Sequence, residues 1–161
     1  MKRRVVPGPD RRVLIRDGST MSLRVESGVT SRTGSALPSW ATVEWSGRIG
    51  HPSSYGLLGG TPSRVPSVNV GEAGGRFADS LAASADDVRW GLPPEYEGPV
   101  LEVLVAQPRP VHINRAAHGL VGSSEVVFRA VTRLLCQILT AGLPADDLEV
   151  WKLRDACWND S

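Results

Sequence analysis

The segment from 123 to 142, SSEVVFRAVTRLLCQILTAG, constrains the fold most, because it has the clearest helical periodicity in the chain. Ser123 or Gly122 is suited to begin a helix here, Glu125 favours the first turn, and Gly142 is suited to end it. Polar side chains recur every four residues and apolar ones cover the opposite face. A helix with such a wide apolar face must pack against a sheet or other helices. The face consists of Val127, Phe128, Val131, Leu134, Leu135, Ile138 and Leu139.

Shorter segments in the first third of the chain alternate between polar and apolar residues, which is typical of strands. Residues 11–18 and 21–30 are two such segments, separated by the turn signal Asp17–Gly18. Residues 40–49 alternate as well. We expect 21–30 and 40–49 to form an antiparallel hairpin with the loop 31–39 at its tip.

The second half of the chain predicts a further helix and two further strands. Residues 93–107 begin with prolines and acidic residues that favour a helix start, although Pro99 removes one hydrogen bond from its ladder. Residues 110–119 alternate like a strand, and residues 147–156, DLEVWKLRDA, predict a last strand. Residues 76–93 are compatible with either a strand or a short helix.

Residues 46–76 are rich in glycine, proline and serine and show no sustained period. The segment is long for a routine connection, so we predict a functional loop or an insertion, with a short strand around 66–70. Together these elements predict one domain over residues 1–161. The expected fold is an α+β two-layer sandwich, a mainly antiparallel sheet with two helices on one face.

The formal net charge of +1 produces no overall field that draws the chain to nucleic acid. The charge is uneven, however, because residues 2–16 hold six basic side chains and one aspartate. Such an arm is able to contact phosphates, and a solvated terminal segment is the alternative interpretation. The basic start lacks the apolar stretch of a secretory signal, and no segment is long and apolar enough to span a membrane, so we expect a cytoplasmic protein.

Two motifs in the second half occur together. Residues 91–96 are GLPPEY, and residues 116–131 are AAHGLVGSSEVVFRAV, with His118 in a turn before the helix. In this order and at this separation they resemble domain IV of elongation factor G and related translational GTPases. The resemblance implies a ribosomal protein S5 domain 2-like fold. It also implies two loops at one tip that contact transfer RNA and ribosomal RNA, with His118 on one and residues 31–39 on the other.

The chain departs from the family's pattern in three places. Gly122 stands where the family has an aspartate before the serines, so one loop-fixing carboxylate is missing. The 31–39 loop keeps only Arg32 and Gly34 of the family's glycine-rich basic pattern. No GxxxxGK[ST] motif is present, so the sequence predicts a standalone module that is not a GTPase.

Histidines are the candidate catalytic residues. His118 at the turn is suited to bind phosphate or to act as an acid or base near neutral pH. His112 lies six residues earlier, on the same face of the strand if the strand is regular that far. His51 is far away in sequence, so we expect no metal site and no cofactor. Ser123 and Ser124 are better explained as helix caps than as nucleophiles.

Two functions of different classes follow, and a third is open. The first is a non-enzymatic module that binds the ribosome or RNA through Arg32, Arg115, His118 and the basic arm. The second is a cofactor-independent isomerase, cyclase or lyase acting on a small-molecule substrate. Its acid/base would be His118 or His112, and Tyr55 and His51 would close a lid over a tryptophan-lined pocket. A homodimer formed through an exposed sheet edge is the third.

Overall fold

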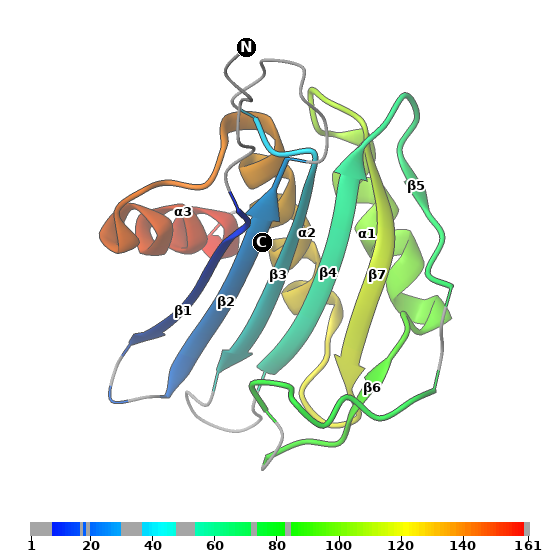
Figure 1. Cartoon of the computed structure of the whole chain (residues 1–161). Coiled ribbons are helices and arrows are strands. Elements are labelled where there is room, and N and C mark those ends of the chain that lie inside the picture. Colours follow the sequence, from blue (N-terminus) through cyan, green and yellow to red (C-terminus); the bar gives the residue numbers. More distant parts are fainter. Residues whose placement is uncertain are drawn as a thin grey trace.

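The computed structural model describes residues 8–16, 18, 20–29, 37–47, 54–71, 74–82 and 85–159. Within these residues, seven strands form one open sheet and three helices cover one of its faces (Figure 1). The strands are β1 (Asp10–Arg16), β2 (Met21–Gly28), β3 (Trp40–Gly47), β4 (Ser54–Pro62), β5 (Ser67–Val68), β6 (Val88–Trp90) and β7 (Val111–Gly119). The helices are α1 (Pro94–Val105), α2 (Glu125–Ala141) and α3 (Asp147–Asn159).

The sheet is mainly antiparallel, as the sequence predicts. Strands β1 to β4 form a meander in which each pairs with the next, and β7 then pairs antiparallel with β4. The other edge of β7 is shared by two short strands, β5 in parallel and β6 antiparallel. The predicted hairpin of 21–30 and 40–49 is confirmed by the β2–β3 pair, and the predicted short strand near 66–70 is β5.

Three helices, not two, cover the sheet, because residues 147–156 are helical and the predicted strand is wrong. Val150, Trp151, Arg154 and Cys157 are buried at helical spacing, whereas a strand would bury every second residue. Trp151 packs edge-on against Trp45 of β3, with ring centroids 6.4 Å apart. The alternation of the segment is short enough to fit either period.

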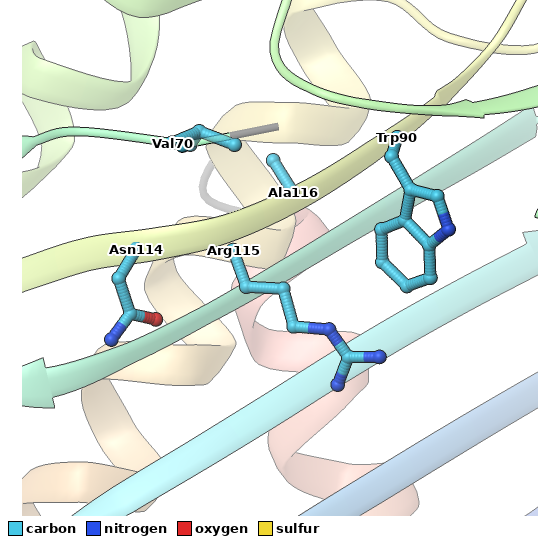
Figure 2. A pocket seen from close by; sticks show the side chains of 6 residues that line it. Val70, Trp90, Asn114, Arg115 and Ala116 are labelled. Carbon is cyan, nitrogen blue, oxygen red and sulfur yellow. The ribbon is translucent and has the colours of Figure 1, made fainter. Parts of the chain in front are cut away.

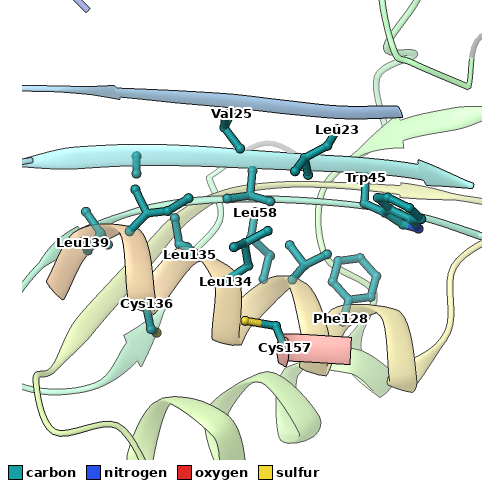
Figure 3. Packing of buried hydrophobic residues seen from close by; sticks show 14 of the residues in the cluster. Leu23, Val25, Trp45, Leu58, Phe128, Leu134, Leu135, Cys136, Leu139 and Cys157 are labelled. Carbon is teal, nitrogen blue, oxygen red and sulfur yellow. The ribbon is translucent and has the colours of Figure 1, made fainter. Parts of the chain in front are cut away.

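The core lies between the helices and the sheet (Figure 3). Val25 and Leu58 of the sheet and Leu134 of α2 are completely buried there. The predicted apolar face of α2 supplies much of this core, and the Ser124 hydroxyl caps the helix by accepting a hydrogen bond from the Val127 N–H. Helix α1 continues through Pro99, so the helix predicted over 93–107 is also confirmed.

The segment 46–76 is not one long loop, because β4 lies within it at the centre of the sheet. Its glycines interrupt the alternation of polar and apolar residues that identifies a strand, and the packing explains two of these glycines. A β-carbon on Gly56 would lie 3.1 Å from the Val127 side chain of α2, and one on Gly60 would lie 2.5 Å from the His112 carbonyl oxygen. The strand therefore uses glycine where helix α2 and strand β7 approach most closely.

Candidate functional site

His118 lies at the end of β7 and is half-buried. Its Nδ1 is 2.9 Å from the carbonyl oxygen of Gly91. A carbonyl only accepts hydrogen bonds, so Nδ1 carries the proton and the imidazole ring is held against the start of the α1 segment. The ring therefore connects β7 to the 91–96 motif.

The turn that follows His118 is fixed by Asp86. The Asp86 carboxylate accepts hydrogen bonds from the N–H groups of Val121, at 3.0 Å, and Gly122, at 2.7 Å. The Ser123 hydroxyl accepts a bond from Gly119 N–H and donates one to the Tyr55 carbonyl. A residue 36 positions earlier thus fixes the backbone at Gly122, and both serines of the motif have structural partners.

His112 and His118 are not brought together. The β4–β7 register shifts at Gly59 and Gly60, so that Asn114 is an extra residue in β7. An extra residue reverses the alternation, and His112 and His118 consequently point to opposite faces of the sheet. The Nδ1 of His112 is 2.6 Å from the Ser67 hydroxyl of β5, which ties that ring to the sheet edge.

The strand ends that flank the expected 31–39 loop lie at the opposite end of the sheet from the His118 turn. Gly28 pairs with Trp40 at the end that holds the start of β7, whereas the His118 turn follows the end of β7 (Figure 1). These strand ends do not fit the implied tip shared by residues 31–39 and His118, and residues 30–36 themselves lie outside the described part of the chain. The predicted site residues Arg32 and His51 lie outside the described residues.

Tyr55 is a core residue of β4 and not part of a lid. Its hydroxyl donates a 2.6 Å hydrogen bond to Oε2 of Glu44, which is itself only 1% exposed. Burial raises the pKa of Tyr55 far above its ordinary value, and the neighbouring Glu44 charge raises it further. Tyr55 therefore acts as a fixed donor inside the sheet.

Part of the predicted basic arm is used within the fold. Arg12 donates hydrogen bonds to Asp10 and Asp147 and to the carbonyl oxygen of Pro144. Arg16 forms a bidentate pair with Asp155 of α3, at 2.8 and 2.9 Å. These arginines join β1 to the α3 region. Residues 1–7 lie outside the described part of the chain.

A pocket of about 430 Å³ opens where the edge of β7 is not covered (Figure 2). Strand β5 pairs with β7 at residues 112–113, β6 pairs at residues 117–119, and the Gly91 N–H donates to the Ala116 carbonyl, which leaves a gap over residues 114 and 115. The pocket is lined by Val70, Gly71, Trp90, Asn114, Arg115 and Ala116. Neither His112 nor His118 lines it.

Arg115 is the exposed cation of this pocket, and its side chain extends from β7 toward the Trp90 ring (Figure 2). The centre of its guanidinium lies 4.7 Å from the ring centroid of Trp90. Phe77 stacks on Trp90 in turn, with centroids 4.3 Å apart and planes 11° from parallel. With respect to the described residues, the Arg115 guanidinium has neither a hydrogen bond nor an ion pair. Its donors are therefore oriented and available.

Sequence reasoning selected Arg115 but missed its neighbours. The composition alone does not distinguish Trp90 from the other tryptophans, most of which pack in or against the core, as Trp45 and Trp151 do. The signal that separates Trp90 is its place just before the 91–96 motif. Asp86 and Asn114 carry no local signal, because their roles depend on the pairing of distant strands.

Within the described ranges, no three histidine, cysteine, aspartate or glutamate side chains gather closely enough to hold a metal ion. A search of the same residues finds no helix with the length and hydropathy needed to cross a membrane. Comparisons with protein-family models, with curated proteins and with solved structures give no match to this chain.

Proposed function

We propose that this chain is a non-enzymatic RNA-binding module that binds RNA, free or within the ribosome, through the Arg115–Trp90 pocket. The proposal rests on the exposure and the contacts of Arg115. Its guanidinium is exposed, held over an aromatic ring and unpaired with any described residue. An arginine fixed in this way presents its donors to an anion without first breaking an internal ion pair.

The chemistry of the pocket suits single-stranded RNA. Arginine binds phosphate through two parallel hydrogen bonds, and its planar group also stacks on unpaired bases. The amide of Asn114, which is exposed beside Arg115, adds one acceptor and two donors. A volume of about 430 Å³ is sufficient for one nucleotide.

The order of elements supports the link to translation. After residue 91 the chain forms a helix, a strand, a turn with His118 and a second helix, which is the order implied by the resemblance to domain IV of elongation factor G. On this ground we propose that the fold of the chain is ribosomal protein S5 domain 2-like. The proposed surface is the open edge of β7 rather than the tip.

An acid/base enzyme is the less supported alternative. It needs a histidine beside a substrate cavity, whereas His118 is bonded to the Gly91 carbonyl and His112 to Ser67. Neither ring lines the Arg115–Trp90 pocket. The position of the cation beside the aromatic ring therefore favours binding over catalysis.

Fluorescence anisotropy with a short fluorescein-labelled single-stranded RNA tests the proposal. Arg115→Ala should weaken binding about tenfold, the loss expected for a charge-assisted contact of about 1.4 kcal/mol. Lys152→Ala on α3 is the matched control, because it removes the same charge from an exposed site on the helical layer. Binding should also weaken as salt rises from about 50 to about 200 mM.

Two results would overturn the proposal. One is the absence of binding to single-stranded RNA even at low salt. The other is equal affinity of the Arg115→Ala and Lys152→Ala variants. Cosedimentation with ribosomes at low salt, repeated with Arg115→Ala, then shows whether ribosomal RNA is the source of the ligand.

A further inference from the structure

The sheet edge that holds the Arg115–Trp90 pocket belongs to a surface strip without acidic residues. The strip consists of residues 61–71 and 106–115, neither of which contains an aspartate or a glutamate. The two segments lie side by side, because β5 pairs with β7 and the Ser63 N–H donates to the Pro110 carbonyl oxygen at 3.0 Å. The strip contains three arginines, Arg64, Arg109 and Arg115. It therefore has an excess of three positive charges in a chain whose formal net charge is +1.

Arg64 and Arg109 are available to a ligand. Arg64 lies in the loop before β5 and Arg109 in the loop before β7, and these loops are at the same end of the sheet (Figure 1). Both residues are exposed, and neither has an ion pair or a side-chain hydrogen bond with any residue that the structure describes. Each guanidinium group can therefore bind an anion without losing an internal partner.

The strip is longer than one nucleotide. Arg109 precedes Arg115 by six residues, so their α-carbons lie at most about 20 Å apart at about 3.3 Å per residue. Asn69 and Asn114 lie between them on the strip and are exposed. Amide side chains commonly bond sugar and phosphate oxygens. The strip thus combines cations and neutral polar groups over a length that suits an extended anionic chain.

The other side of the pocket has no such excess of positive charge. Residues 74–90 contain two arginines and three aspartates. A hydrogen bond from Arg89 and, less, the charges of Arg89 and Arg76 lower the pKa of Asp87, so both cations already act on a carboxylate of their own segment. A polyanion that leaves the pocket consequently meets an excess of positive charge along the strip and not along residues 74–90.

We propose that this strip binds the backbone of the RNA strand that enters the Arg115–Trp90 pocket, with Arg64 and Arg109 each contacting a phosphate. Such contacts increase affinity and fix the course of the strand, but they do not distinguish one base from another. This inference rests on the proposed RNA-binding function and adds the direction in which the strand continues from the pocket.

Fluorescence anisotropy with a labelled single-stranded octanucleotide tests the course of the strand. The double variant Arg64→Ala/Arg109→Ala should bind at least tenfold more weakly at about 50 mM salt, and its slope of log affinity against log salt should be shallower by about 1.4, or about 0.7 for each lost phosphate contact. The matched control is Arg76→Ala/Lys152→Ala, which removes the same charge from exposed positions outside the strip. Its salt slope should equal that of wild type.

Arg64→Lys/Arg109→Lys keeps both charges and should retain the wild-type salt slope, since lysine also binds phosphate. Equal affinities and equal slopes of the two double alanine variants, with Arg115→Ala still weakening binding, would overturn the strip and leave the pocket as the RNA-binding site. Failure of wild type to bind the octanucleotide at low salt would overturn both.

Discussion

The Asp86 carboxylate fixes the turn between β7 and α2, so its removal gives a defined stability change. Asp86→Asn keeps the shape of the side chain and one acceptor oxygen. It replaces the other oxygen with an amide nitrogen, which would face the N–H of Val121 or Gly122. One charge-assisted hydrogen bond is lost, and one backbone donor in the turn loses its partner.

The expected cost follows from these contacts. A hydrogen bond to an ionised group contributes about 1.5–3 kcal/mol, and Asp86 is partly exposed, so we expect the free energy of unfolding to fall by about 2 kcal/mol. The midpoint of thermal unfolding should then fall by about 4–8 °C in a chain of this length. Urea denaturation followed by circular dichroism measures the change directly.

Asp87→Asn is the matched control, one residue away. Asp87 pairs with Arg89 at the surface, where both side chains are well exposed, and such pairs contribute about 0.5 kcal/mol or less. Equal urea midpoints for the Asp86→Asn and Asp87→Asn variants would refute the conclusion that the Asp86 carboxylate stabilises the turn between β7 and α2.

Two further predictions concern titrating groups. Burial, with a smaller contribution from Cys157, raises the pKa of Cys136 to about 12, so at about pH 8 its thiolate fraction is about one in ten thousand; mass spectrometry should find Cys136 unmodified by iodoacetamide in native protein, and rapid native labelling would contradict this. Hydrogen bonds from Arg16, and less from Arg154, lower the pKa of Asp155. Its stabilising effect is present above the unfolded pKa and is lost as pH falls through the folded pKa, so the free energy of unfolding should fall less below about pH 4 in Asp155→Asn than in wild type. If the free energy of unfolding had the same pH dependence in both proteins, the Arg16–Asp155 ion pair would not contribute to stability.

Elements with a long or clean period could be predicted from the sequence. The apolar face of α2 repeats over several turns, which leaves no other structure that buries it. Strand β3 alternates between Ala41, Val43 and Trp45 on the helix side and Thr42 and Glu44 on the other. Each of these patterns separates a buried face from the opposite face of the same element. The pattern lies within one segment of the sequence and can therefore be recognised without knowledge of the fold.

The predictions from the sequence are wrong where tertiary contacts determine the local structure. The glycines of β4 resemble a loop because their close neighbours, such as Val127, come from elsewhere in the chain. The alternation of residues 147–156 fits a strand until Trp151 is placed against Trp45. The bulge at Asn114 has no signal of its own, yet it decides which face His118 occupies.

The candidate site was predictable only in part. Arg115 stands out as a cation in the strand that follows α1, and it does line the pocket. Its partners Trp90 and Phe77 belong to a segment without a clear period. Only the folding of that segment over the sheet places them beside β7.

The pairing of β4 with β7 has a consequence for the order in which the chain folds. Strands β1 to β4 contact sequential neighbours, so their loops are closed at low entropic cost. Strand β7 pairs with a strand from which it is separated by residues 63–110, and it holds both β5 and β6. Contacts of high sequence separation form slowly. We therefore expect the N-terminal meander to form before the Arg115–Trp90 pocket, which exists only once β7 has docked.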